Sequence, residues 1–350
     1  MIAVIGTRPQ FIKHASLEMA ARGKMDIESI HTGQHFDENM SSIFFDQLKI
    51  NTPKYNLDSE GKTHGSQTAS MLIGIEEILL DEKPDFVLVY GDSNTTLAGA
   101  LSASKLNIPI VHVEAGLRSF NKNMPEEINR ILTDHTADTL FCSSPEGIHN
   151  LSKEGIKNGV FLVGDIMKDL VLHYTSKDSK LDKLYNFDYY YATLHRPYNV
   201  DNKDRLMQIF DVLNTLDHKV VFAIHPRTKV NVGKYQIDLS KFENIHVIES
   251  QSYFKNLDHI TESLAVITDS GGMQKESYWL LKKCVTIRSE TEWTETLRHD
   301  ANTLVFENLQ DIQNVINLAP KKFDDSLYGY GNTGSQIVDT LINNYQKNLN

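Results

Sequence analysis

The sequence predicts an α/β protein of two domains, each built around an open parallel sheet. Its 350 residues are about twice a common domain length, which favours two domains. In both halves, short apolar runs alternate with segments whose apolar residues recur at helical spacing, which is the pattern of βαβ units. A polar, charged stretch without a strand pattern, residues 164–188, separates the two series, and we expect the domain boundary and hinge near Asp165 to Lys180.

Composition narrows the classes of partner. The formal charge of −11 argues against a nucleic-acid-binding or membrane-binding surface, although a phosphate site can still be built locally. No run approaches the roughly 18 apolar residues of a membrane span, and the chain opens on a strand pattern without a signal peptide. Cys142 and Cys284 lie in apolar, strand-like runs, which indicates free thiols in a reducing compartment. We therefore expect a soluble cytoplasmic protein.

The first half opens with a predicted strand, residues 1–6, and a helix that begins at Pro9. Proline suits the first turn of a helix because its missing N–H needs no partner there. Arg8 and Lys13 then flank the positive end of this helix, so they are either solvated cations or part of an anion site. The further elements expected are strands at 27–33, 86–92, 108–116, 139–144 and 160–165, and helices at 39–48, 66–85, 95–107 and 145–155 and from Pro125.

Residues 51–67 are polar and rich in turn formers, and they predict a loop over the strand ends. His35 and His64 have no companions at metal-ligand spacing. We expect both to be ordinary loop histidines, and no metal site.

Three carboxylates, Asp92, Glu114 and Glu126, mark the expected active site. Asp92 and Glu114 lie at the ends of successive strands, where open parallel sheets hold their ligands. Asp92 could instead cap the next helix, whereas Glu114 lies in an apolar run and needs a partner or a function. Glu126 lies in the first turn of a helix, which favours acids on structural grounds alone. Arg130, four residues later on the same face, could pair with Glu126 or face a ligand beside it.

The second half repeats the strand and helix alternation. Strands are expected at 188–196, 219–226, 244–250, 263–270, 284–288 and 302–306, and the chain closes on a helix at 335–350. His195 follows a strand, as Arg8 does in the first half. Ser270, Gly271 and Gly272 lie between a strand and a helix, where exposed N–H groups and a hydroxyl would form a small phosphate cradle. Glu276, within that helix, could accept hydrogen bonds from both hydroxyls of a ribose.

Five segments in order carry a family resemblance: GTRPQFIK (6–13), TGQHFDENM (32–40), YGDSNTTLAGALSA (90–103), HVEAGLRSFNKNMPEEINRILTDH (112–135) and TDSGGMQKES (268–277). Together they resemble the non-hydrolysing UDP-N-acetylglucosamine 2-epimerases, and the combination is specific although each piece alone is weak. The resemblance implies two Rossmann-like, doubly wound domains of GT-B-like architecture with the nucleotide sugar in the cleft between them. It places the first domain at 1–167, with helix 335–350 packed back on it, and the UDP-binding domain at 168–334. It also implies a homodimer.

The resemblance implies a role for each candidate residue. Asp92, Glu114, Glu126, Arg130, His195 and Lys13 are expected to be catalytic, and Arg8, Lys13, His195, Ser270, Gly271, Gly272 and Glu276 to bind the UDP-sugar. The family eliminates UDP to give 2-acetamidoglucal and adds it back with a proton delivered to the opposite face, without a metal or organic cofactor. A redox route is not expected either, because GTRPQF is not the GxGxxG dinucleotide fingerprint.

The segment from Thr291 to Glu295 departs from the family pattern. An arginine followed by a proline usually stands where Trp293 and Thr294 are, so either another cation, such as Arg288 or Arg298, contacts the phosphates or the site is arranged differently. Similar tryptophan-containing versions occur in archaeal-type members and in enzymes that act on UDP-2,3-diacetamido-uronates. The expected substrate pair is UDP-GlcNAc and UDP-ManNAc, for surface polysaccharide synthesis, with UDP-2,3-diacetamido-2,3-dideoxyglucuronate as the alternative.

Two other functions fit the same architecture. A GT-B glycosyltransferase would need an acceptor cleft and one general base rather than three carboxylates. An inactive UDP-sugar-binding protein would need no acids around a neutral ring carbon. A second, activating UDP-GlcNAc site is known in several family members; Gln34 and His35 match it, but helix 66–79 lacks the arginine that usually assists.

Overall fold

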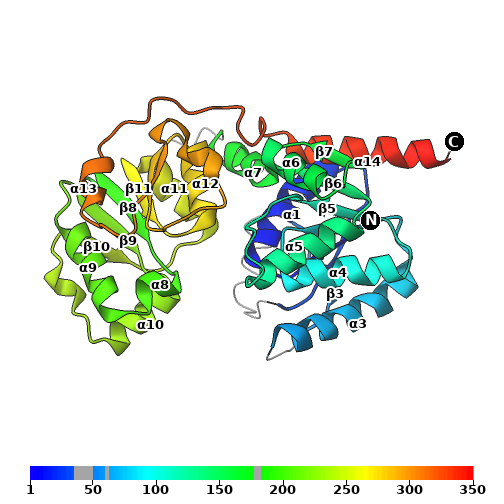
Figure 1. Ribbon diagram of the computed structural model, residues 1–350, viewed down its shortest axis with the longest axis horizontal. Coiled ribbons are helices and arrows are strands. Elements are labelled where there is room, and N and C mark those ends of the chain that lie inside the picture. The colour runs from blue at the N-terminus through cyan, green and yellow to red at the C-terminus, as the bar shows by residue number, and fades with distance from the viewer. Residues whose placement is uncertain (35–49, 60–62, 177–182, 350) are drawn as a thin grey trace. The chain divides into compact units, whose positions relative to one another are not determined.

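The first unit of the protein is built on a seven-stranded sheet whose strands all pair in parallel (Figure 1). The structure is a computed structural model that describes residues 1–34, 50–59, 63–176 and 183–349. The strand order is β3-β2-β1-β4-β5-β6-β7, so the winding direction reverses between β1 and β4. The strands are β1 (Ile2–Ile5), β2 (Glu28–His31), β3 (Tyr55–Asn56), β4 (Val87–Tyr90), β5 (Ile110–Val113), β6 (Thr139–Cys142) and β7 (Val160–Leu162).

Helices cover this sheet and complete its core. Helix α4 packs on β1, β4 and β5 and lies beside α3 and α5, while α1 packs on β1. Buried side chains from β1, β2, β4, α3 and α4, among them Val4, Ile75 and Val89, form one apolar cluster. The strands read as continuous apolar runs because a parallel sheet is covered on both faces. The helices of this unit are α1 (Arg8–Ala21), α3 (His64–Glu82), α4 (Asn94–Lys105), α5 (Pro125–Thr136), α6 (Pro145–Lys153), α7 (Ile166–Thr175) and α14 (Thr333–Leu349).

The second unit repeats this topology with a six-stranded parallel sheet of order β10-β9-β8-β11-β12-β13. Its winding direction reverses between β8 and β11. The strands are β8 (Tyr189–Thr193), β9 (Lys219–Ala223), β10 (Ile245–Ile248), β11 (Ala265–Thr268), β12 (Lys283–Thr286) and β13 (Asn302–Leu304). The helices are α8 (Pro197–Val200), α9 (Lys203–Asn214), α10 (Pro226–Lys234), α11 (Tyr253–Glu262), α12 (Gly271–Trp279) and α13 (Asp311–Val315), with short 3₁₀ segments at Leu239–Lys241 and Thr294–Asp300.

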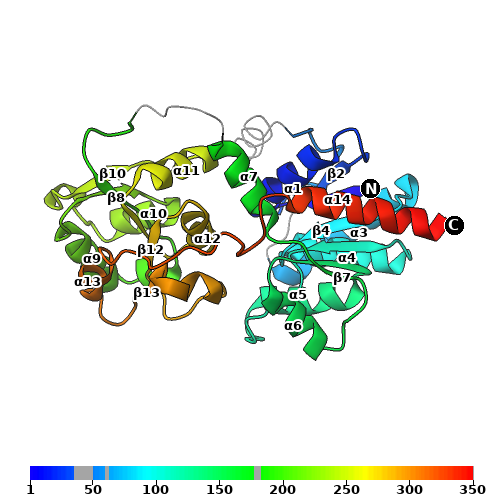
Figure 2. The same cartoon turned by 90° about the horizontal axis from the view of Figure 1, so that it is seen from above.

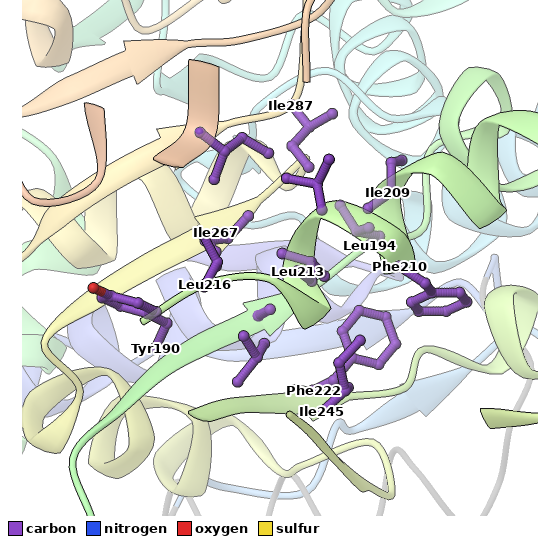
Figure 3. Packing of buried hydrophobic residues seen from close by; sticks show 14 of the residues in the cluster. Tyr190, Leu194, Ile209, Phe210, Leu213, Leu216, Phe222, Ile245, Ile267 and Ile287 are labelled. Atoms are coloured by element: carbon purple, nitrogen blue, oxygen red, sulfur yellow. The ribbon is translucent and has the colours of Figure 1, made fainter. Parts of the chain in front are cut away.

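A large apolar cluster fills one side of this second sheet (Figure 3). Leu213 of α9 and Phe222 of β9 are fully buried in it. The rings of Phe210 and Phe222 meet edge to face with centroids 5.5 Å apart, a favourable aromatic geometry. This packing holds β8 and β11 rigidly, and their carboxyl ends carry the polar residues described below.

The chain divides into two compact units, residues 1–173 with 326–350 and residues 174–325. The sequence prediction placed the boundary at 167/168, at the beginning of α7. Helix α14 lies along α1 (Figure 2). Its first N–H groups, from Thr333 and Gly334, donate to the Asp169 carboxylate at 3.1 and 2.7 Å. A negative charge is favourable at the amino terminus of a helix, so this contact attaches the last helix of the chain to α7 of the first unit.

Two elements of the first unit were not expected from the sequence. The predicted loop 51–67 contains β3, which adds to the edge of the first sheet beside Ile30 and His31. A two-residue strand is too short to show an alternating pattern. The predicted hinge contains α7, whose buried Ile166, Leu170 and Val171 recur at helical spacing within a polar segment. The helix expected at 39–48 and His35 lie outside the described residues, and no helix of the described chain is long and apolar enough to cross a membrane.

Gly116, between β5 and α5, should tolerate no side chain. Its φ is +80°, and an added Cβ would lie 2.7 Å from the carbonyl carbon of Gly147. We expect Gly116→Ala to cost about 1–2 kcal/mol of backbone strain plus about 1–3 kcal/mol of overpacking, measured by urea unfolding. Gly155→Ala is the matched control, because Gly155 has φ +86° and nothing within 4 Å of the added Cβ. An equal loss of unfolding free energy in the two variants would show that the contact with Gly147 is unimportant.

Candidate active site

Asp92, Glu114 and Lys13 meet at the carboxyl end of β4, beside the point where the first sheet reverses direction. Gly91 connects β4 to Asp92 with φ +64°. A Cβ at residue 91 would lie 3.2 Å from Glu114 Oε2 and 3.3 Å from Lys13 Nζ. Glycine at this position therefore lets the Glu114 and Lys13 side chains come together over the strand end.

Glu114 is held in a strained backbone conformation at the end of β5. Its φ is +73°, which costs a non-glycine residue about 1–2 kcal/mol. The N–H groups of Glu114 and Ala115 both donate to the Phe141 carbonyl at 3.0 Å. The carboxylate pairs with Lys13 Nζ of α1, and the two side chains are only 11% and 7% exposed. Strain that the surrounding structure maintains is typical of functional positions.

Arg130 of α5 connects the Asp92 carboxylate to a second acid. Its Nη2 lies 2.5 Å from Asp92 Oδ2, and its Nη1 lies 3.0 Å from Glu127 Oε2. Asn129 adds a hydrogen bond from its side-chain amide to the Asp92 carbonyl at 2.9 Å. The beginning of α5 thus holds both the backbone and the side chain of Asp92.

The environment of Asp92 suits a group that carries a proton. Burial raises the pKa of its carboxyl group, and the neighbouring Glu114 carboxylate raises this pKa further. Arg130 and Lys13 oppose the shift, but the net pKa of Asp92 is still raised. Two carboxylates that share a site commonly separate their pKa values in this way.

Glu126 and Arg8 complete the predicted residues of this unit. Arg8 is the half-buried first residue of α1. Glu126 is half buried in the first turn of α5, and its side chain forms no hydrogen bond or ion pair with the described residues. Of the two acids that follow Pro125, the buried Glu127 pairs with Arg130, and Glu126 does not.

In the second unit, Asp269 organises the carboxyl ends of β8 and β11. Its buried carboxylate accepts hydrogen bonds from the backbone N–H groups of His195 and Arg196, both at 3.0 Å, and from Asn199 Nδ2 at 3.1 Å. His195 Nδ1 lies 3.3 Å from Asp269 Oδ1. The loop after β8 and the His195 ring are therefore fixed together.

A local cluster of positive charge surrounds His195. Burial lowers the pKa of His195, Arg196, Arg227 and Arg288 lower it further, and Asp269 opposes them. Arg288 donates to Glu292 at 2.8 Å through Nη2, while Arg288 Nη1 and Arg196 Nε are buried without a hydrogen-bond partner in the described chain. Guanidinium N–H groups in this state are suited to bind an anion.

The predicted phosphate cradle lies at the amino end of α12, across the same reversal point. Ser270 is the N-cap of α12, and its hydroxyl makes no capping hydrogen bond. An added Cβ at Gly271 would lie 2.8 Å from Glu292 Oε1, whereas at Gly272 the nearest atom, Glu276 Oε1, is 3.8 Å away. Glu276 is buried one turn into the helix. Within the described residues, no group of three His, Cys, Asp or Glu side chains could hold a metal ion.

Comparison with known proteins identifies the family of this chain. Residues 17–342 match the sequence profile of the UDP-N-acetylglucosamine 2-epimerases. The chain belongs to this epimerase family. A UDP-N-acetylglucosamine 2-epimerase homolog of Methanococcus maripaludis is 44% identical over 98% of this chain and 99% of its own length. The UDP-2,3-diacetamido-2,3-dideoxy-D-glucuronate 2-epimerase of Pseudomonas aeruginosa is also 44% identical, over 97% of this chain and 99% of its own.

A solved epimerase structure has the same fold. The UDP-GlcNAc 2-epimerase of Methanocaldococcus jannaschii, crystallised with UDP-GlcNAc and UDP, matches with a TM-score of 0.87 and 41% identity. The match covers 97% of this chain and 99% of that structure. The GT-B-like, two-domain α/β fold expected from the sequence is confirmed.

In this member of the epimerase family, Trp293 packs on a buried lysine. Lys275 Nζ lies 3.8 Å from the centre of the Trp293 ring, within the range of a cation–π contact. Of the two arginines considered as substitutes for the missing family arginine, Arg288 lies in the His195 cluster. Arg298 is exposed in the 3₁₀ segment Thr294–Asp300.

Sequence reasoning missed several supporting residues of this epimerase. Glu127 directly follows a predicted catalytic residue, and only its burial and its contacts with Arg130 and the Ser119–Phe120 backbone distinguish it from Glu126. Gln10 accepts from the N–H groups of Gly6 and Thr7 at 2.8 and 3.1 Å and donates to the Tyr90 carbonyl at 3.0 Å, which joins the ends of β1 and β4. The sequence analysis assigned no role to Arg196, which directly follows His195. Long-range partners of this kind leave no local sequence signal.

Glu127 and Glu126 form a matched pair for a stability test. Burial acts to raise the pKa of Glu127, but hydrogen bonds from Ser119 and Phe120 and the Arg130 contact outweigh it, so the net pKa is lowered. Its stabilising effect should therefore be complete above the unfolded pKa of about 4.3 and be lost as the pH falls through the lower folded pKa.

At pH 7 we expect Glu127→Gln to lower the free energy of unfolding by about 3–5 kcal/mol, because Arg130 then loses a buried partner. Glu126→Gln should change it by less than about 0.5 kcal/mol, because the Glu126 side chain forms no hydrogen bond or ion pair with the described residues. Urea unfolding at pH 7 and again at acid pH checks both the size of the difference and its decrease on acidification. A difference that grows as the pH falls would contradict this assignment.

Proposed function

We propose that this chain interconverts UDP-GlcNAc and UDP-ManNAc by eliminating UDP and adding it back to 2-acetamidoglucal. The observation that carries the proposal is the pair of carboxylates at the end of the first sheet, Asp92 and Glu114, each with its own cation. The M. jannaschii relative crystallised with UDP-GlcNAc and UDP supports the choice of substrate.

The chemistry explains why several acids are needed. The hydrogen on carbon 2 is not next to a carbonyl, so its direct removal would give an unstabilised carbanion. Breaking the C1–O bond while the proton leaves gives a neutral glycal instead. One carboxylate must then accept the proton from one face and another acid must deliver a proton to the other. Asp92, Glu114 and Glu126 are the groups proposed for these transfers, with Arg130 and Lys13 orienting the first two.

The second unit is proposed to stabilise the leaving UDP. His195, Ser270, Gly271 and Gly272 would bind the diphosphate and Glu276 the ribose, while Arg8 supplies a further cation from α1. We assign to Arg288 the phosphate contact that an arginine at position 293 makes in many relatives, because its Nη1 has no hydrogen-bond partner in the described chain. Preorganised donors of this kind act where negative charge develops in the transition state.

A second substrate, UDP-2,3-diacetamido-2,3-dideoxyglucuronate, is favoured by one observation. The P. aeruginosa epimerase named for this sugar is as similar to this chain, at 44% identity, as the M. maripaludis homolog. The reaction and the residues would be the same, and only the sugar contacts would differ. A glycosyltransferase or an inactive binding protein is disfavoured by membership of an epimerase family. A homodimer and a cytoplasmic location remain predictions; the buried free thiols Cys142 and Cys284 suit a reducing compartment.

The first experiment incubates the protein in heavy water with UDP-GlcNAc and, in parallel, with the diacetamido-uronate. We expect the epimer to form with one solvent deuterium at carbon 2, because the glycal regains its hydrogen from an acid that exchanges with water. Proton NMR and mass spectrometry measure the product and its label. Epimer formed without solvent deuterium would contradict elimination and re-addition, and the faster substrate identifies the sugar.

The second experiment removes one acid at a time. Asp92→Asn and Glu114→Gln should each lower kcat by about 10²–10⁴-fold, the range for a lost general acid or base, while the Kd for UDP changes by less than about threefold. Asp81→Asn, on the exposed face of α3, is the control for removal of one negative charge. Wild-type kcat in either variant would remove that carboxylate from the mechanism.

A further inference from the structure

A fully buried histidine, His112, lies behind the carboxylates and takes no part in the proposed chemistry. It lies on β5, two residues before Glu114, and its side chain is 1% exposed. Its Nε2 is 2.8 Å from the carbonyl oxygen of Gly91, and its Nδ1 is 2.7 Å from Asp134 Oδ1. The imidazole therefore bridges the end of β4 and helix α5.

Both partners of this imidazole are acceptors. A carbonyl oxygen cannot donate, so Nε2 must carry a proton. The Asp134 carboxylate already accepts from Arg118 Nη1 at 2.6 Å and from the Gly116 N–H at 3.1 Å. Asp134, which accepts from these two donors, is a carboxylate, and its net pKa is lowered although burial acts to raise it. Nδ1 then donates as well, and the ring is a doubly protonated imidazolium.

Charge balance around the ring agrees with this protonation state. Arg118 also donates from Nε and Nη2 to Glu154 at 2.7 and 2.8 Å. With His112 positive, the buried group holds two cations and two anions and is neutral; with His112 neutral it would carry a net negative charge. The other titratable groups near it are His135, 3.3 Å from Glu154, and the Cys142 thiol, which lies near Asp134 and whose pKa burial raises to about 12.

The hydrogen bond from His112 to the Gly91 carbonyl is important because Gly91 connects β4 to Asp92. Its carbonyl precedes Asp92, and its α-carbon faces the Glu114–Lys13 pair. Helix α5, on the other side of the imidazole, carries Glu126 and Arg130. Rotation of the Gly91 peptide would move Asp92 relative to all of these groups.

We propose that His112, as an imidazolium, is a positioning residue that fixes Asp92 relative to Glu114 and to the beginning of α5. The inference rests on the proposed epimerase function, in which the carboxylates must lie correctly about one sugar carbon. A misplacement of about 1 Å costs about a hundredfold in rate, so loss of the Gly91 bond should lower kcat.

Two substitutions separate the two bonds of the ring. His112→Asn keeps a donor at the Nδ1 position, toward Asp134, and loses the one toward Gly91. His112→Gln keeps a donor at the Nε2 position, toward Gly91, and loses the one toward Asp134. We expect kcat to fall about a hundredfold in His112→Asn with the Kd for UDP unchanged, and less than about tenfold in His112→Gln. Thermal unfolding of both variants shows how much folded enzyme each assay contains. Equal kcat per folded molecule in the two variants would overturn the positioning role.

The protonation state has its own measurement, which needs no activity. In protein labelled with ¹⁵N-histidine, we expect both ring nitrogens of His112 to resonate as protonated at neutral pH, because each faces an acceptor. The His112→Gln spectrum identifies the signals. A single protonated nitrogen in an enzyme that epimerises either UDP-sugar would overturn this inference alone. A wild type inactive on both sugars would refute the proposed function, and the positioning role with it.

Discussion

The carboxyl edge of the first sheet depends on the pairing of two carboxylates, the largely buried Glu114 and the half-buried Asp92, with cations. An ion pair that loses one member leaves a buried charge and costs about 3–5 kcal/mol. Glu114 therefore needs Lys13, and Asp92 needs Arg130. These four residues come from β5, α1, the end of β4 and α5, so the pairing fixes how two helices approach two strands. The same arrangement gathers two acids and two cations at one edge of the sheet.

The two units share one topology but carry different charged residues at the ends of their strands: acids in the first unit and arginines in the second. In each sheet the winding direction reverses between the first strand and the fourth, and candidate residues such as Asp92 and His195 closely follow these strands. The first unit places acids there, with enough cations to keep them ionisable. The second places His195 among three arginines beside the open N–H groups of α12. A protein with a formal charge of −11 can thus contain a local cluster of cationic side chains.

Many relatives have an arginine where this chain has Trp293, yet a positive charge remains nearby. The tryptophan covers the buried Lys275, and Arg288 remains in the His195 cluster. Glu292 forms an ion pair with Arg288, and its carboxylate also lies close to Gly271. The positive charge of the segment that follows β12 therefore comes from Arg288 rather than from residue 293.

The sequence by itself determined the fold class, the strands of both sheets apart from β3, and the set of candidate residues. It could do so because buried parallel strands are continuous apolar runs and because motif residues directly follow the ends of these strands. It also predicted that Glu114 must have a partner, since a lone carboxylate in an apolar run is unfavourable. Only the tertiary structure decided which partners these residues have. Lys13 and Glu114 are 101 positions apart, Asp92 and Arg130 are 38 apart, and His112 reaches Gly91 across neighbouring strands. Such pairs depend on the register of the strands and the rotation of helices about their axes, and no short window of sequence specifies either.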